Sequence, residues 1–318
     1  MTASESKTPG SSARSGGLLA IGLRSLTVRN FRLFAVGQIA SATGTWMMVV
    51  AQDWLVLDLS GDSGTALATV TALQFTPMLL LTLYGGRMAD RYDKRALLTG
   101  ANVVSGVLAL LLGLLVTGDA ARLSHVYVFA LALGVANAVE VPARLSFIAE
   151  LVGQDLVPNA SALSGAYFNI ARVLGPSLAG LLIEAAGTGT VMLLNAASYA
   201  ATVAGLRAIR PEELHRSPRP AARDARVAEG LAHLRSRPDL VATLALLAAV
   251  SLFGLNLQLT LPLMARTVFH TDAAAFGLLT AALAAGSLLA AFTGFFFPGP
   301  PPGPPGDRLG LFLRRPGG

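Results

Sequence analysis

Residues Gly86-Arg87-Met88-Ala89-Asp90-Arg91-Tyr92-Asp93-Lys94-Arg95 form the most charged short run before residue 200, and they separate two long apolar stretches. The run contains four basic residues, and short loops rich in lysine and arginine resist translocation across a membrane. It therefore predicts a tight cytoplasmic turn between two membrane-spanning helices. Gly85, Gly86 and Ala89 are small enough to let the two helix ends approach closely. Asp90 is placed to cap the following helix or to pair with a neighbouring helix end.

The composition of the chain is that of an integral membrane protein. Of its 318 residues, 53% are hydrophobic and 13% are charged, whereas soluble domains carry roughly 25% charged residues. The mean hydropathy is +0.60. The net charge of +6 does not indicate nucleic-acid binding, because the basic residues lie in loops between apolar stretches. We therefore expect the lipid bilayer as the environment and no nucleic acid as a partner.

The sequence offers few groups for metal or covalent chemistry. It contains no cysteine, which excludes disulfides, thiol catalysis and cysteine metal sites. The four histidines, at positions 125, 215, 233 and 270, are too scattered to form a ligand pair. We therefore expect no metal site and no cofactor. A membrane enzyme finds no support either, since no nucleophile is paired with a base.

The long apolar stretches predict an all-α membrane protein with about eight transmembrane helices. A bilayer-spanning helix needs about 20 mostly apolar residues, and backbone groups in lipid must form their hydrogen bonds internally. Spans three and six are the plainest, and Val107 to Val116 of span three contains only Leu, Val, Ala and Gly, so both are expected to be outer, lipid-facing helices. The predicted spans cover residues 33–57, 65–85, 97–117, 126–149, 160–185, 189–207, 241–268 and 274–297.

The basic residues are distributed unevenly along the chain. All but four of the 24 lie in the N-terminal tail, in the loops after spans two and six, or at the end of the chain. The exceptions are Arg122, Arg144, Arg172 and Arg266. Because cytoplasmic loops carry the excess of lysine and arginine, the N-terminus and the even-numbered loops are predicted to be cytoplasmic. We expect a multi-pass protein of the cell (plasma or inner) membrane.

Polar residues in the first span form a stripe. Gln38, Ser41, Thr45 and Gln52 lie on one helical face, and such a face turns toward protein or a water-filled cavity rather than lipid. Asp53 follows directly, about 12 Å from the centre of the span, where hydration at the membrane surface would suffice to accommodate it. Gln38, Gln52 and Asp53 are candidate residues of a substrate or proton pathway.

Spans four and five carry ionisable residues deep in the predicted membrane. Asn137, Glu140 and Arg144 share a helical face, and Glu140 and Arg144 are four positions apart, so they can pair directly. Arg172 and Asn169 lie in span five. A charge near the middle of a span costs roughly 2.5–3.5 kcal/mol, so Arg172 needs a partner, and Glu140 is the nearest acid by depth. Two interpretations stay open, namely mutual neutralisation that fixes helix packing, or a substrate and proton site.

The run at 86–95 resembles the loop between helices 2 and 3 of major facilitator superfamily (MFS) transporters. The positions that match this motif are Gly86, Asp90, Arg91, Lys94 and Arg95. In the family this loop acts as a latch between conformations, so the resemblance implies a latch with Asp90 as its central acid. The alternative is a positively charged anchor on the cytoplasmic side with no further role.

Three other stretches resemble the superfamily, two of them a drug- and siderophore-exporting branch that includes enterobactin and macrolide exporters. These two are residues 30–56 and residues 168–176, whereas the third stretch, residues 253–263, resembles the seventh helix of the superfamily as a whole, and its Asn256 and Pro262 fit a cavity-lining role. The resemblance implies an MFS-type helical bundle with a binding site near the bilayer midplane.

The same resemblance implies a function. We expect a secondary transporter that couples protons to the efflux of a hydrophobic or amphiphilic small molecule, such as a drug or siderophore. Protonation of Glu140 would change its pairing with Arg172 or Arg144 and bias the two conformations of the carrier. The partners implied are a small-molecule substrate and the proton, and the chain is expected to act as a monomer.

The patterns divide the chain into five segments. The resemblance ends near residue 295, and the Pro/Gly-rich run that follows cannot form a helix, which points to a C-terminally truncated or frameshifted chain. The alternative function is therefore a non-transporting fragment or membrane scaffold. The predicted segments are a cytoplasmic tail at 1–30, a six-helix MFS bundle at 31–208, a basic cytoplasmic linker at 209–238, two helices of a second bundle at 239–297, and an aberrant tail at 298–318.

Overall fold

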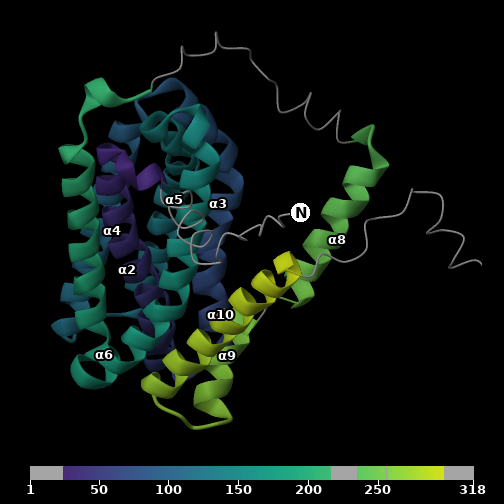
Figure 1. The fold of residues 1–318 in the computed structure, drawn as a ribbon. Helices are drawn as coiled ribbons and strands as arrows, with labels where there is room; N and C mark the ends of the chain where they lie inside the picture. The colour runs from purple at the N-terminus through teal and green to yellow at the C-terminus, as the bar shows by residue number, and fades with distance from the viewer. Residues whose placement is uncertain (1–23, 216–234, 255–256, 297–318) are drawn as a thin grey trace, which may run out of the picture.

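The computed structural model describes residues 24–215, 235–254 and 257–296, and these residues form helices and no strand (Figure 1). The predicted tails, most of the linker and Asn256 lie outside the described residues. In chain order the elements are η1 (Arg24–Thr27), α2 (Arg29–Ser60), α3 (Gly64–Arg91), α4 (Lys94–Thr117), α5 (Leu123–Val152), η2 (Gln154–Leu156), α6 (Val157–Ala208), η3 (Pro211–Glu213), α8 (Pro238–Gly254), α9 (Leu257–Thr267) and α10 (Ala273–Phe296).

The helices reproduce the predicted spans. Five stretches of described helix are long and apolar enough to cross a membrane, and they contain the first six spans. Spans five and six run together in α6, whose backbone is broken only at Gly187, where φ is 78° and ψ is 166°. Pro176 lies within the helical backbone of the same element. The seventh span is formed by α8 and α9, and the eighth by α10.

The turn within residues 86–95 is as tight as predicted. Only Tyr92 and Asp93 separate the end of α3 from the start of α4. The helix cap, however, is Asp93 rather than Asp90, because the Asp93 carboxylate accepts a hydrogen bond from the backbone N–H of Ala96 at 2.9 Å. An N-cap residue must lie just outside the first helical turn, whereas Asp90 is still part of α3.

Small residues allow the helices of the bundle to approach closely. A Cβ atom on Gly85 of α3 would collide with the carbonyl oxygen of Ala138 on α5, and one on Gly134 of α5 would collide with the carbonyl oxygen of Gln74. Nothing lies within 4 Å of the corresponding position at Gly86. Of the two adjacent glycines, only Gly85 is therefore needed for helix contact, as expected where backbones meet in a membrane bundle.

Aromatic and aliphatic side chains fill the bundle at the end that holds the α3–α4 turn, which we call the loop end. Phe31 and Phe34 of α2, Leu98 of α4, and Phe147 and Leu151 of α5 are fully or almost fully buried there. The rings of Phe34 and Phe147 meet edge to face, with centroids 5.6 Å apart. A second apolar cluster lies toward the opposite, or far, end of the bundle.

The helices after the linker join the bundle at one side only. In Figure 1, α9 and α10 lie against the lower part of the bundle, whereas α8 extends away from it. The contact of α10 with α6 is close, since a Cβ on Gly277 would collide with the carbonyl oxygen of Pro176 and one on Gly180 would crowd Ala273. This contact leaves a cavity between the two groups of helices.

Candidate functional site

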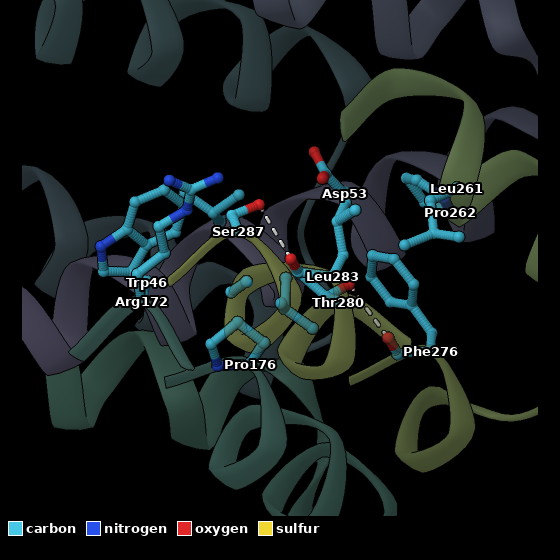
Figure 2. Close-up of a pocket in the computed structure, with 13 residues that line it drawn as sticks. Trp46, Asp53, Arg172, Pro176, Leu261, Pro262, Phe276, Thr280, Leu283 and Ser287 are labelled. Carbon is cyan, nitrogen blue, oxygen red and sulfur yellow. Dashed lines mark hydrogen bonds between the residues drawn. The ribbon is translucent and has the colours of Figure 1, made fainter. Parts of the chain in front are cut away.

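The cavity has a volume of about 270 Å³ and lies where α2 and α6 face α9 and α10 (Figure 2). Both groups of helices supply its walls, so a molecule held there touches both. Its lining residues are Trp46, Val49, Val50 and Asp53 of α2, Arg172 and Pro176 of α6, Leu261 and Pro262 of α9, and Phe276, Thr280, Leu283, Ala284 and Ser287 of α10.

Asp53 is the acidic residue of this cavity. Its exposed fraction is only 9%, so the prediction of a hydrated residue at the membrane surface is wrong. The reason is that α9 and α10 cover this face of α2, which the sequence of span one alone does not reveal. Within residues 24–215, 235–254 and 257–296, no hydrogen bond or ion pair to the Asp53 carboxylate is found. A buried carboxylate without a partner is stabilised either by a proton or by a cation.

Arg172 is the basic residue of the cavity, and its partner is not the one expected. Its guanidinium lies over the ring of Trp46, 5.7 Å from the centroid, in a cation–π contact. The expected pairing with Glu140 is wrong, because Glu140 already forms an ion pair with Arg144 at 3.1 Å within α5. Trp46 is held in turn by Phe168, whose ring meets it edge to face at 5.9 Å.

The predicted pair in α5 forms, but away from the cavity lining. The side chains of Glu140 and Arg144 are 18% and 20% exposed, and their direct i, i+4 pairing is confirmed. Asn137, one turn earlier, is half-buried. Asn169 of α6 donates its side-chain amide hydrogen to the carbonyl oxygen of Gly165 in the same helix, at 2.8 Å. Neither asparagine lines the cavity.

The polar stripe of α2 faces protein, as predicted. Gln38, Ser41 and Gln52 are buried and Thr45 is half-buried. Gln52 donates a long hydrogen bond of 3.4 Å to the side-chain oxygen of Gln74 on α3. Part of the polar stripe therefore serves the packing of α2 against its neighbouring helices.

The basic residues of the α3–α4 turn bind the ends of two other helices. Lys94 forms an ion pair with Glu150 near the end of α5. Arg95 donates hydrogen bonds to the carbonyl oxygens of Leu206, at 2.7 Å, and Arg207, at 2.9 Å, in the last turn of α6. Such carbonyls have no partner within the helix, and a cation there also complements the helix dipole.

The two remaining motif residues are placed differently. Asp90 and Arg91 are exposed, on the last turn of α3. The motif thus consists of two basic residues engaged with the bundle and an exposed acidic–basic pair beside them. Gly86, the first motif position, is half-buried with open space next to it.

Comparison with known proteins decides the family. A family model described as "Transmembrane secretion effector" matches residues 21–296. The chain belongs to this family of MFS transporters. It is 29% identical over 158 residues to the staphyloferrin A transporter of Staphylococcus aureus, covering 49% of this chain and 39% of that protein. It is 28% identical over 213 residues to the multidrug efflux pump Tap of Mycobacterium tuberculosis, covering 63% and 49%.

The chain therefore spans about half the length, or less, of these curated relatives of the transmembrane secretion effector family. Among solved structures it is similar to a bacterial homologue of the human lysosomal transporter Spinster in an inward-facing, unoccupied conformation. That match has a TM-score of 0.64 at 14% identity and covers 85% of this chain and 62% of the other. At this identity the match shows the fold alone, which is the MFS fold that the sequence predicted.

In this family member, the far end of the bundle holds a charged cluster that the sequence analysis missed. Arg266 of α9 lies 2.6 Å from Asp58 of α2 and 2.5 Å from Asp62 in the α2–α3 turn. Its guanidinium also lies over the ring of Trp54, 5.1 Å from the centroid. Trp54 stacks on Phe276 of α10, with centroids 6.1 Å apart. We call Arg266, Asp58, Asp62, Trp54 and Phe276 the far-end cluster.

One signal in the sequence pointed to the far-end cluster. Arg266 is one of the four basic residues outside the cytoplasmic segments, and Asp58 and Asp62 flank Gly61 directly after span one. Gly61 has the left-handed conformation, with φ of 63°, and ends α2. The turn holds both acids at the same end of the bundle, but their pairing across helices depended on the tertiary fold.

Proposed function

We propose that this chain acts in secondary active transport, as a proton-coupled exporter of a hydrophobic or amphiphilic small molecule that works by alternating access. Membership of a transporter family supports transport, and the curated relatives named as a siderophore transporter and an efflux pump favour export. The observation that carries the proposal is the cavity between the two groups of helices, lined by a buried carboxylate and a guanidinium.

The position of the cavity suits alternating access. In such carriers two bundles rock around a central site, and a ligand shifts the equilibrium only if its affinity differs between the two states. Here α2 and α6 form one wall, and α9 and α10 form the other. A bound molecule would therefore change its contacts whenever the two groups move apart.

Asp53 is our first candidate for the proton site. It lies in the cavity without a partner among the described residues, so it can exchange a proton for a cationic group of a substrate. Glu140 is our second candidate, because its protonation would release Arg144 from the ion pair within α5. Both assignments rest on burial and charge pairing.

The proposal is tested in inverted membrane vesicles with an acidic interior, with the amphiphilic cation ethidium as probe. We expect the chain to drive ethidium accumulation that collapses when the pH gradient is dissipated. Asp53→Asn should abolish this accumulation, whereas Asp119→Asn, in the exposed α4–α5 loop, should not. Wild-type accumulation by Glu140→Gln would remove Glu140 from the mechanism. An inserted, folded chain without any gradient-driven accumulation would favour the membrane scaffold instead.

We also propose that the α3–α4 turn is the conformational latch, with Gly86, Asp90, Arg91, Lys94 and Arg95 as its residues. Its support is that Lys94 and Arg95 bind the ends of α5 and α6 in this conformation. Asp90 and Arg91 are exposed and free to meet another surface when the helices rearrange. The turn would lie in the cytoplasm, on the same side as the N-terminus, in the plasma or inner membrane.

A further inference from the structure

The cavity holds an acidic and a basic side chain that do not pair with each other. Asp53 and Arg172 both line it, yet they form no ion pair with each other, and no described residue forms one with either. An ionised carboxylate without a partner costs free energy in such a place, so Asp53 needs either a proton or a cationic partner, and Arg172 needs an anionic one. A ligand that carries complementary charges would do so.

The two ionisable side chains lie apart in the cavity. Trp46 and Asp53 are seven positions apart on α2, which corresponds to about 10 Å along a helix. Arg172 lies over Trp46, so its charge belongs to the Trp46 end. In Figure 2, Trp46 and Arg172 lie together at the left, Asp53 lies to their right, and Leu261, Pro262 and Phe276 lie beyond it.

The cavity wall between Arg172 and Asp53 is apolar. Val49 and Val50 of α2 lie between Trp46 and Asp53 in the sequence, and Leu261 and Leu283 face them from α9 and α10. The hydroxyl groups of α10 do not change this character, because Thr280 and Ser287 donate their hydrogens to carbonyl oxygens of their own helix, at 3.0 and 2.9 Å. The dashed lines in Figure 2 mark these two bonds.

The Arg172 end can donate hydrogen bonds to an anion. The cation–π contact with Trp46 uses none of the guanidinium N–H groups in a hydrogen bond, and among the described residues none accepts one from Arg172, so these groups are available to a carboxylate. The buried indole N–H of Trp46 has no acceptor among the described residues either. The Asp53 end, by contrast, offers acceptors once its carboxylate is ionised, which suits an ammonium group.

We propose that the cavity binds an elongated zwitterionic amphiphile, with a cationic amine at Asp53, an anionic group at Arg172 and an apolar chain between them. This inference rests on the proposed function, in which the cavity is the substrate site. The cavity volume of about 270 Å³ is near the lower end of the range for ligand pockets, which suits a single slender molecule. A ligand with a single charge would pair with only one of the two ionisable side chains.

The test measures binding to the purified full chain by calorimetry, with ω-aminoalkanoic acids of increasing chain length as probes. Each is compared with the alkylamine and the alkanoate of the same length. We expect the ω-aminoalkanoic acid that matches the spacing to bind about tenfold more tightly than either single-charge probe, equivalent to about 1.4 kcal/mol. Shorter and longer members of the series should lose this advantage.

Two variants test which charged group of the probe each side chain binds. Asp53→Asn should make the ω-aminoalkanoic acid bind no better than the alkanoate, and Arg172→Gln should make it bind no better than the alkylamine. Asp119→Asn, an exposed loop change, should keep the wild-type preference. Equal binding of all three probe classes by the wild-type chain overturns the inference even if a variant does not fold. An unchanged preference in a folded Asp53→Asn protein overturns it too.

The outcome is separable from that of the proposed function. Selective binding of the zwitterions without gradient-driven transport would leave this inference standing and contradict the proposed exporter. Ethidium transport combined with equal affinity for the three probe classes would support the exporter and refute the zwitterion site.

Discussion

At the scale of single residues, the two adjacent glycines near the end of α3 have different structural roles. Gly85 lies where the backbones of α3 and α5 meet, and any side chain there would collide with the carbonyl oxygen of Ala138. Gly86 faces open space. The sequence grouped them because both are small, but a rotation of 100° per residue around the helix turns one toward α5 and the other away.

This difference predicts unequal effects of the same substitution. Gly85→Ala should lower the thermal midpoint of the purified protein, because overpacking against a backbone atom costs typically about 1–3 kcal/mol. Gly86→Ala should leave the midpoint close to wild type. The comparison is made by thermal unfolding in one detergent, and equal midpoints for the two variants would contradict the α3–α5 contact.

The partners of the charged residues could be predicted from the sequence only in part. The Glu140–Arg144 pair was predictable, because i, i+4 residues of one helix are neighbours whatever the rest of the fold does. The partner of Arg172 was not predictable, because it depends on how α6 is rotated against α2. In the structure, the ring of Trp46 on α2 lies beside the Arg172 guanidinium. The burial of Asp53 likewise depended on two helices that follow more than 200 residues later.

At the scale of elements, the far-end cluster ties α9 to the α2–α3 turn. Arg266 is 24% exposed, whereas Asp58 and Asp62 are 48% and 39% exposed, so each ion pair contributes only about 0–1 kcal/mol. The cation–π contact with Trp54 adds about 0.5–1 kcal/mol. Together these contacts approach the 1.4 kcal/mol that changes a two-state population about tenfold.

Arg266→Gln should therefore open the far end of the bundle. The chain contains no cysteine, so spin labels can be attached specifically to cysteines introduced at the exposed Leu59 and Val268. We expect the distance distribution between the two labels to shift toward longer values in Arg266→Gln.

A matched control is available for this experiment. Arg237→Gln removes an exposed pair with Asp239 at the start of α8, and it should leave the distances between the labels unchanged. Identical distributions in wild type and Arg266→Gln would show that the cluster does not hold this end closed.

The element boundaries themselves were largely predictable. The thickness of the bilayer sets the length of an apolar span, so hydropathy locates each helix without knowledge of its neighbours. The junction of spans five and six agrees as well, because the gap predicted at 186–188 contains Gly187, where the backbone of α6 is broken. Glycine can take a positive φ without strain, so a single non-helical residue is enough to join the two spans.

At the scale of the whole molecule, the charges at the two ends of the bundle imply an orientation in the membrane. The loop end gathers Lys94 and Arg95 with the basic start of the linker, and the asparagine amide of Asn30 donates to the carbonyl oxygen of Arg210 at 3.0 Å. The far end has the Arg266 cluster with its two acids. By the positive-inside rule, the loop end should face the cytoplasm.

Single cysteines test this orientation, again because the chain has none of its own. Tyr92 in the α3–α4 turn and Asp119 in the α4–α5 loop are both exposed and lie at opposite ends of α4. A membrane-impermeant maleimide added to intact cells should label Asp119→Cys and not Tyr92→Cys, and disruption of the cells should make both react. Labelling of Tyr92→Cys in intact cells would invert the topology, and it would place the latch on the wrong side of the membrane for the mechanism proposed here.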